Sequence, residues 1–294
     1  MRKSLTLIFI LIISLSLLGC TKNAVKKPAS VTPPASTESI KKIEPPLPSL
    51  VPSFDKTAVM KAAGKSVPVL MYHSISYKKD NAICLPAEKF EEHLKYLKDN
   101  GYYTLTLTDL YDYFVKDTPV PEKSVVLTFD DGYRDNYTVM FPLLKKYNFK
   151  ATIFVITSNI DKDDNSLTTS NLLEMEKQGI DIESHTVNHE HLKGLTKSAQ
   201  LSELVESKKA LEKILNKQVN FIAYPYGESN KSVIDSAKEA GYTMAFTTNG
   251  RWSSKNNGIL SLDRVYISSF HDMKVFKDRI TNPNYKFTAN WTTL

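Results

Sequence analysis

Short apolar runs alternate with helical patterns along most of this chain, from residue 66 onward. Eight runs are typical of β-strands, and the segments between them place apolar residues at helical spacing. In 86–100, for example, Phe90, Leu94 and Leu97 share one helix face, and Gly101 marks the end. Such strand-then-helix units build a parallel sheet covered by helices. Strands are predicted at 67–72, 102–105, 125–129, 152–156, 180–183, 220–223, 243–247 and 264–267.

Seven or eight such units predict that the sheet closes, or nearly closes, into a barrel. The predicted fold class is therefore α/β, with a single domain over residues 66–294. In barrels of this kind the functional site lies at the carboxyl ends of the strands. Helices are expected at 86–100, 107–115, 138–147, 170–178, 198–216, 231–240 and 272–280.

The first 60 residues have a different character. Two basic residues precede an apolar run from Leu5 to Leu18, which is typical of a secretion signal and short for a transmembrane helix. The run ends in Leu-Leu-Gly before Cys20, which resembles a bacterial lipobox and predicts cleavage and lipidation at Cys20. We expect a signal peptide at 1–19 and a Pro-, Ser- and Lys-rich linker at 20–60 that tethers the domain to the outer side of a bacterial membrane. A plain signal peptide with an incidental Cys is the alternative.

The net charge of +6 is concentrated in this leader. The first 44 residues carry seven basic and two acidic residues, so the remaining 250 are close to neutral. The basic isoelectric point therefore does not indicate a nucleic-acid-binding domain, and it suits a tether beside an anionic surface. Cys84 is the only other Cys, so lipidation of Cys20 excludes a disulfide within the chain.

Two adjacent carboxylates follow the third apolar run, in the segment Thr128–Gly132. Neighbouring strand residues point to opposite faces, but Gly132 permits a tight turn through which both Asp130 and Asp131 can reach one site. One carboxylate can then bind a metal while the other takes a proton. A helix cap or turn is the structural alternative. The preceding strand and a separate pair of histidines favour the functional interpretation.

His185 and His189 form that pair, after the fifth apolar run. On a helical turn residues i and i+4 face the same way, so both imidazoles can bind one metal. Two histidines and one aspartate leave positions open for water and substrate, which is typical of a catalytic metal site. Two surface histidines are the alternative. His191 is a further possible ligand, but the spacing favours His185 and His189.

Two more strand ends carry candidate residues. Segment 223–227 contains a Pro and a Gly that restrain the backbone, so an N–H there can point at an oxyanion. A simple tight loop is equally compatible with this segment. His73 ends the first run, where it is either a core residue or a functional one. Polar clusters at four strand ends indicate that they meet in one site.

These motifs resemble the first two signatures of the polysaccharide deacetylases, carbohydrate esterase family 4 with its NodB-homology domain. The resemblance covers residues 67–280, nearly all of the predicted folded part. It implies a distorted (β/α) barrel and metal-dependent N-deacetylation of N-acetylhexosamine polymers. By position it implies Asp130 as general base, Asp131, His185 and His189 as metal ligands, and Tyr226 as donor of a backbone N–H to the oxyanion.

This chain differs from many members of the family at two positions, and these differences point to one subgroup. Many members have an Arg at the start of the third motif that orients the base, where this chain has Ala223, and Arg264 is a candidate substitute. Many also carry a late Leu-x-His motif whose His is the general acid, but the only late His here is His271. The poly-β-1,6-N-acetylglucosamine deacetylases instead place the acid on the first strand, in a sequence like 69–73. This subgroup makes His73 the preferred acid.

The resemblance thus implies acetate release from N-acetylglucosamine units of an extracellular polysaccharide, with poly-β-1,6-N-acetyl-D-glucosamine of biofilm matrix as the preferred substrate. Zn²⁺ suits two His and one Asp, and Co²⁺, Ni²⁺ or Mn²⁺ would also fit. The expected partners are the glycan and, through the lipid anchor, a membrane. Peptidoglycan N-acetylglucosamine deacetylation and a catalytically silent glycan-binding lipoprotein are the alternatives. The absence of His-Glu-x-x-His disfavours a metallopeptidase.

Overall fold

The computed structural model describes residues 54–55 and 57–286, which belong to one compact unit spanning Leu50–Leu294. The predicted signal peptide, Cys20 and the linker up to residue 53 lie outside the described residues. Within the described part of the chain, no helix is long and apolar enough to cross a membrane. Residues at the end of the predicted linker already pair with the domain, because Met60 bridges Pro121 and the Lys61 N–H donates to the Val120 carbonyl (2.8 Å).

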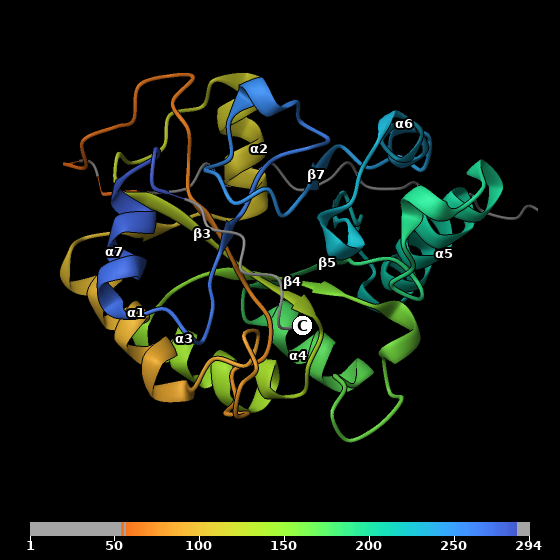
Figure 1. The fold of residues 1–294 in the computed structure, drawn as a ribbon, viewed down its shortest axis with the longest axis horizontal. Coiled ribbons are helices and arrows are strands. Elements are labelled where there is room, and N and C mark those ends of the chain that lie inside the picture. Colours follow the sequence, from red (N-terminus) through yellow and green to blue (C-terminus); the bar gives the residue numbers. More distant parts are fainter. Residues whose placement is uncertain (1–53, 56, 287–294) are drawn as a thin grey trace, which may run out of the picture. The chain divides into compact units, whose positions relative to one another are not determined.

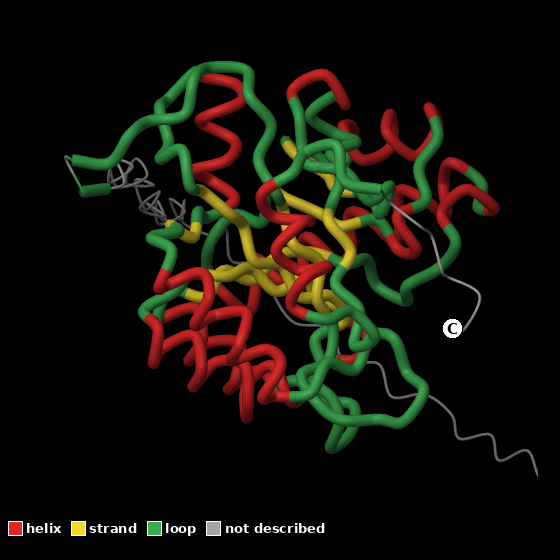
Figure 2. Tube along the Cα trace, turned by 60° about the vertical axis from the view of Figure 1, so that its left-hand side comes forward, coloured by secondary structure: helices red, strands yellow, loops and turns green. Residues whose placement is uncertain are grey.

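A parallel sheet of eight strands lies at the centre of the domain, with helices around it (Figure 2). Seven strands follow the order β7-β6-β5-β4-β3-β1-β8, and β2 pairs with β3 beside this path. The predicted α/β fold of roughly seven parallel strands in a single domain is confirmed. The strands are β1 (Val69–Tyr72), β2 (Tyr103–Thr104), β3 (Ser124–Asp131), β4 (Ala151–Val155), β5 (Ile180–Ser184), β6 (Phe221–Ala223), β7 (Met244–Phe246) and β8 (Val265–Tyr266).

The two ends of this sheet are joined through one segment of chain, residues 259–266. Leu262 pairs in parallel with Phe246 of β7, and Val265 and Tyr266 of β8 then pair with β1. The sheet therefore curls into a distorted barrel, as the resemblance implies. Because the strands are parallel, the carboxyl ends of β1, β3, β5 and β6 open on the same side, where the sequence motifs were expected to meet.

Helices follow most strands and surround the sheet (Figure 1). Helix α1 contacts both α7 and α3, and α5 contacts both α4 and α6. The helices are α1 (Ala87–Asp99), α2 (Leu107–Lys116), α3 (Phe141–Tyr147), α4 (Thr169–Lys177), α5 (Lys197–Leu215), α6 (Lys231–Glu239) and α7 (Met273–Thr281).

One predicted helix differs in detail. The expected helix at 138–147 begins instead as a π-helix, Asn136–Met140, which continues into α3. The Phe141 N–H donates to the Asn136 carbonyl five residues back, and the next residue, Pro142, has no N–H to donate. A π-helical turn is therefore inserted directly after the segment that carries the paired carboxylates.

Alternate strand residues pack into two separate cores. In β3, Leu127 and Phe129 belong to the large cluster between sheet and helices, whereas Val126 belongs to a second cluster with Phe154 of β4 and further inward-facing residues. Since side chains alternate along a strand, Asp130 lies on the same face as Val126. The pleat of the sheet thus directs this carboxylate towards the inside of the barrel.

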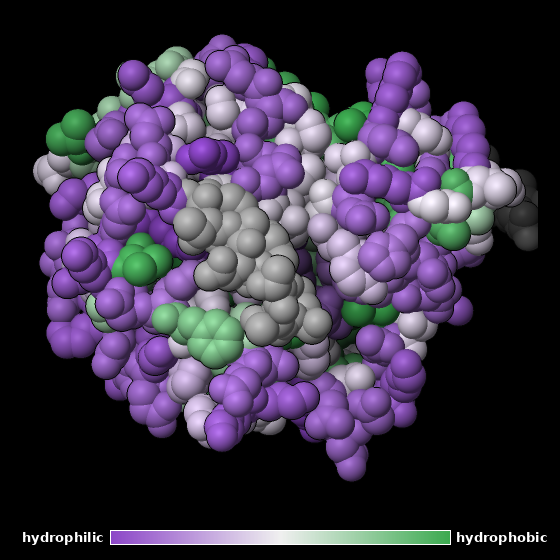
Figure 3. Space-filling model, in the orientation of Figure 1, coloured by the Kyte–Doolittle hydropathy of each residue, from purple (hydrophilic) through white to green (hydrophobic). Residues whose placement is uncertain are grey.

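The outer surface is mainly polar. In the view of Figure 3, hydrophilic residues cover most of the visible face, and hydrophobic residues form small separate patches. This agrees with a near-neutral domain whose apolar residues are concentrated in the two cores.

Candidate active site

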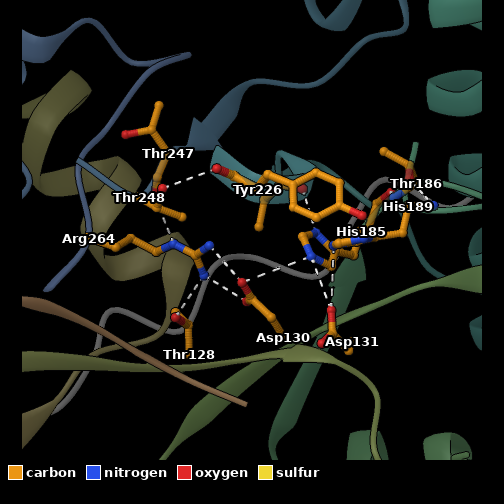
Figure 4. A network of polar contacts seen from close by, with 12 residues as sticks. Thr128, Asp130, Asp131, His185, Thr186, His189, Tyr226, Thr247, Thr248 and Arg264 are labelled. Atoms are coloured by element: carbon orange, nitrogen blue, oxygen red, sulfur yellow. Dashed lines mark hydrogen bonds and ion pairs between the residues drawn. The ribbon is translucent and has the colours of Figure 1, made fainter. Parts of the chain in front are cut away.

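The paired carboxylates at the end of β3 have different surroundings. Asp130 is 2% exposed and receives two hydrogen bonds of 2.7 Å from the Arg264 guanidinium, one to each carboxylate oxygen (Figure 4). Asp131 has a φ of 74° and Gly132 a φ of 77°. These two consecutive left-handed residues end the strand and turn Asp131 towards the site instead of the outer face.

Arg264 is fully buried and is held by more than Asp130. Its Nε donates to the Thr247 carbonyl (3.1 Å), its Nη1 also reaches the Thr128 hydroxyl (3.2 Å), and its guanidinium lies 5.5 Å from the Phe154 ring centre. Burial opposes ionisation of Asp130, but the Arg264 guanidinium and the neighbouring His185 together outweigh it, so the pKa of Asp130 lies below its ordinary value. The structure places Arg264 where a base-orienting residue was expected.

Three potential metal ligands lie together beside this pair: Asp131, His185 and His189, whose ligand atoms are all within 4.8 Å of one another. The Asp131 Oδ1 is 3.4 Å from the His185 Nε2 and 3.7 Å from the His189 Nε2. This oxygen is buried and has no hydrogen-bond partner among the described residues, as expected of an atom reserved for a cation. The donor set therefore fits a divalent metal with open positions.

The backbone brings the two histidines together in a way that the sequence pattern did not predict. His189 does not follow His185 on a helical turn, because the segment after β5 is a loop in which Thr186 (φ 68°) and His189 (φ 57°) are left-handed. The expectation of helical i, i+4 geometry was therefore wrong, although both rings still face Asp131. The loop is held by Glu203 of α5, whose carboxylate accepts the N–H groups of Val187 (3.0 Å) and Asn188 (2.8 Å).

Further contacts determine the tautomer and the protonation of the two histidines. The His185 Nδ1 lies 2.7 Å from the Ala223 carbonyl, which selects the tautomer with a lone pair on Nε2. Burial would lower the pKa of His185, but Asp131 and Asp130 outweigh it and raise that pKa, so the site favours a positive charge at this point. Burial and the neighbouring His185 lower the pKa of His189 to about 4, so its imidazole is neutral at neutral pH.

His73 lines the same pocket, a cavity of about 250 Å³ whose wall includes Asp130 and the three potential metal ligands. We call it the catalytic pocket. The His73 Nδ1 is buried without a hydrogen-bond partner in the described part of the chain. Its backbone is fixed by Asn136 of the π-helix, whose Nδ2 donates to the His73 carbonyl (2.9 Å). The structure thus places His73 with Asp130 around one cavity.

Tyr226 lies at the rim of the catalytic pocket, in a strained turn. Its φ of 58° is left-handed, which is rare for a residue with a side chain. Its carbonyl accepts from the Thr248 hydroxyl (3.2 Å), and a Cβ on the next residue, Gly227, would lie 2.4 Å from the Thr248 nitrogen. Only glycine fits there, so the turn that presents the Tyr226 N–H is sterically determined.

His191 lies outside the metal-ligand cluster. Its ring stacks on the Tyr226 ring, with 3.8 Å between ring centroids and 7° between the planes, and its Nδ1 is 3.3 Å from a Glu228 oxygen. The preference for His185 and His189 over His191 therefore agrees with the geometry. Sequence reasoning missed Glu203 and Asn136, which hold the site from other elements and carry no local signal of that role.

Comparison with known proteins places this geometry in a family. The model for the polysaccharide deacetylases matches residues 117–245, which include the carboxylates, the histidines and Tyr226. YxkH of Bacillus subtilis (strain 168), a protein assigned to the polysaccharide deacetylases, is 43% identical over 202 residues, covering 69% of this chain and 71% of that protein. The chain belongs to the polysaccharide deacetylase family. It is therefore a hydrolase of amide bonds, and the family's dependence on a metal agrees with the Asp-His-His cluster.

Two further similarities describe this deacetylase more closely. It is similar to the Streptococcus pyogenes deacetylase PplD in complex with acetate, with a TM-score of 0.71 and 33% identity over 74% of this chain and 99% of that one. It is also similar to the poly-β-1,6-N-acetyl-D-glucosamine N-deacetylase of Staphylococcus aureus (strain MRSA252), with 29% identity over 211 residues that cover 67% of this chain and 72% of that enzyme.

Proposed function

We propose that this deacetylase removes acetyl groups from N-acetylglucosamine units of poly-β-1,6-N-acetyl-D-glucosamine in a biofilm matrix. The observation that carries the proposal is His73 at the end of β1, facing the same cavity as Asp130 and the metal-ligand cluster. This is the acid position of the subgroup that acts on that glycan. The similarity to the Staphylococcus aureus enzyme supports the same substrate.

Asp130 is the proposed general base. Arg264 keeps its carboxylate ionised and oriented, and the nearer oxygen lies 4.0 Å from the His185 Nε2, next to the metal ligands. From there Asp130 accepts a proton from water as the water oxygen attacks the acetamide carbon. A protonated carboxylate, or one pointing elsewhere, could not accept this proton. The buried Arg264 guanidinium prevents both, because it stabilises the charged form and fixes the orientation of Asp130.

Asp131, His185 and His189 are the proposed metal ligands. A bound divalent cation supplies the Lewis acidity that polarises the acetamide carbonyl and makes water more acidic. Zn²⁺ fits this donor set best, and Co²⁺, Ni²⁺ and Mn²⁺ are the other candidates.

Two groups complete the proposed reaction. The Tyr226 N–H is the proposed hydrogen-bond donor to the carbonyl oxygen as negative charge develops there. His73 then donates a proton to the sugar nitrogen while the C–N bond breaks, leaving acetate and a glucosamine unit. The acetate thus carries the oxygen of the attacking water, and Asp130 holds one of its protons. Asp130 then gives up that proton and His73 regains the one it donated, so both residues return to their starting states.

The proposed location is outside the cytoplasmic membrane, anchored by a lipid on Cys20. The Leu-Leu-Gly-Cys20 sequence after an apolar leader supports this proposal, and the Pro-rich stretch that follows would give the domain reach towards an extracellular polymer. Metabolic labelling with a radioactive fatty acid would test it. A Cys20→Ala variant should lose the label and leave the membrane fraction.

The decisive test is acetate release by the purified, Zn²⁺-loaded protein from poly-β-1,6-N-acetyl-D-glucosamine and from peptidoglycan. Preference for the first substrate, with a loss of about 10²- to 10⁴-fold in both Asp130→Asn and His73→Ala, is the expected result. His191→Ala is the matched control and should retain activity. Full activity in His73→Ala would refute the acid assignment, and preference for peptidoglycan would refute the substrate. Release from neither would refute the proposed substrate.

A further inference from the structure

The proposed acid and the proposed base come from neighbouring strands. Tyr72 of β1 pairs with Phe129 of β3, so the residues that follow them, His73 and Asp130, continue the same register. Both line the catalytic pocket. An acid and a base that serve one amide group must both be placed accurately, because an error of about 1 Å can cost about 100-fold in rate. The proposed reaction therefore depends on how the backbone of His73 is fixed relative to Asp130.

Asp135 and Asn136, which are adjacent in the sequence, contact the residues that follow β1. The Asn136 Nδ2 donates to the His73 carbonyl (2.9 Å). The Asp135 carboxylate accepts the Ser74 hydroxyl (2.6 Å) on one oxygen and the Ile75 N–H (2.8 Å) on the other. We call Asp135 and Asn136 the clamp. It holds the chain at His73 and again directly after it.

Asn136 is fully buried, and its polar side chain is only partly satisfied. Its Nδ2 donates both to the His73 carbonyl and to the Asp135 Oδ1 (3.1 Å). Both partners are acceptors, so the amide nitrogen must face them. Its Oδ1 is buried without a hydrogen-bond partner among the described residues, which costs about 1–3 kcal/mol. An apolar residue would avoid this cost, so the donor at Nδ2 is the feature that requires an asparagine here.

One segment, residues 130–136, carries the proposed base, a proposed metal ligand and the clamp. Asp130 and Asp131 lie at its start, and the clamp lies at its end. Between them the Arg134 N–H donates to the Asn165 carbonyl (2.7 Å), and the π-helix begins at the second residue of the clamp. These contacts hold the clamp in place relative to the base. Through the clamp, the same segment fixes the backbone of the residue that follows β1.

We propose that Asp135 and Asn136 are positioning residues, which set the place of His73 relative to Asp130 during deacetylation. This inference rests on the proposed function and deepens it. Asn136 acts through the His73 carbonyl, and Asp135 acts through the two residues that follow it. Neither residue lines the catalytic pocket, so the clamp influences the reaction by way of His73 and not by contact with the glycan.

The test is a double-mutant cycle on acetate release from poly-β-1,6-N-acetyl-D-glucosamine by the Zn²⁺-loaded protein. Asn136→Ala should lower kcat about 10- to 100-fold and leave KM unchanged, because only the position of the acid changes. His73→Ala/Asn136→Ala should be no slower than His73→Ala, because the clamp then has no acid to position. Asn100→Ala is the matched control. The Asn100 amide also donates to a backbone carbonyl, that of Tyr96 (2.8 Å), and this variant should behave as wild type.

Two variants of Asp135 separate the shape of the clamp from its charge, and they decide the question if Asn136→Ala does not fold. An asparagine keeps an oxygen for the Ile75 N–H and an amide that can bond to the Ser74 hydroxyl. Asp135→Asn should therefore keep kcat within about threefold of wild type, whereas Asp135→Ala should lose about 10-fold or more. Equal losses in the two variants would refute positioning by contact.

Wild-type kcat in Asn136→Ala, or losses that multiply in the double variant, would overturn the positioning role. Wild-type activity in His73→Ala would instead overturn the acid assignment, and a wild type that released no acetate would overturn the proposed substrate. Crystal structures of wild type and Asn136→Ala then decide the clamp without any measurement of activity. Displacement of His73 from Asp130 in the variant would support the clamp, and an unchanged His73 would refute it.

Discussion

The buried pair of Arg264 and Asp130 leads to a prediction about stability that is independent of catalysis. Arg264 is fully buried, Asp130 is 2% exposed, and two hydrogen bonds of 2.7 Å join them. Removing one partner of such a pair costs about 3–5 kcal/mol, because the other charge stays buried without compensation. Arg264→Met should therefore lower the free energy of unfolding by that amount and the melting temperature by roughly 6–20 °C.

The double variant Asp130→Asn/Arg264→Met separates this cause from simple loss of packing. Neutralising both partners removes the uncompensated charge, so the double variant should be more stable than Arg264→Met alone. Urea unfolding with a chelator present measures all four proteins of the cycle without a contribution from metal binding. Arg251→Met is the matched control, since Arg251 is exposed and donates to a carbonyl, that of Tyr285 (2.9 Å). It should change stability by less than about 1 kcal/mol.

Two results would refute this reasoning. Additive losses in the double variant would show that the two charges do not compensate each other. A loss below about 1 kcal/mol in Arg264→Met would show that Asp130 finds another partner or accepts a proton. Arg264→Lys gives a second check on orientation. It retains the charge but not the two-pronged contact, so it should recover stability better than activity.

Three further predictions concern other parts of the fold. Burial lowers the pKa of His93 to about 3, so between pH 7 and pH 5 this side chain takes up a proton only in the unfolded chain. The free energy of unfolding should therefore fall by about 2 kcal/mol over this pH range, and urea unfolding should show a smaller fall in His93→Gln. Gly227→Ala should destabilise by several kcal/mol more than Gly64→Ala, whose Cβ would meet open space; equal melting temperatures would contradict the steric argument. Glu203→Ala should weaken Zn²⁺ binding about 10- to 100-fold in a chelator competition, whereas Glu206→Ala, exposed on the same helix, should leave it unchanged.

Much of the fold could be predicted because its signals are local. All eight strands and the helices follow from apolar runs, periodicity and end residues, which depend on neighbours in the sequence. The number of units also predicted a closed or nearly closed sheet, but not the pairs that close it, in which Leu262 and Val265 contact opposite ends of the sheet. Such pairing joins segments that are distant in sequence and has no periodic signature.

The site, like the fold, has some features that a local sequence signal predicts and others that depend on distant contacts. Asp130, Asp131 and His185 stand at strand ends, and the strand end is a local signal, whereas His189 lies in the loop that follows β5. The conformation that joins the histidines was predicted wrongly, because left-handed Thr186 and His189 depend on contacts such as the one from Glu203, 15 to 16 residues away, to the loop. Sequence spacing alone cannot distinguish this loop from a helical turn.

The position of the guanidinium suggests a final test of how this fold orients its base. Members of the family with an Arg at the start of the third motif place it where this chain has Ala223, on β6. Ala223 pairs with Phe246, and the Arg264 Nε bonds to the next carbonyl, that of Thr247, so the two positions are close in the barrel. A second guanidinium at 223 would be buried beside the first, which explains why a small residue is compatible with Arg264 here.

Ala223→Arg alone should therefore destabilise the protein by about 3 kcal/mol or more, because it buries a second cation without a partner. Ala223→Arg/Arg264→Ala should be more stable than Ala223→Arg and should release acetate faster than Arg264→Ala, since one guanidinium again faces Asp130. Ala223→Leu controls for the added volume without charge. If Ala223→Arg/Arg264→Ala were no more active than Arg264→Ala, the base would need its guanidinium from the position just before β8, and the two positions would not be equivalent ways of orienting one carboxylate.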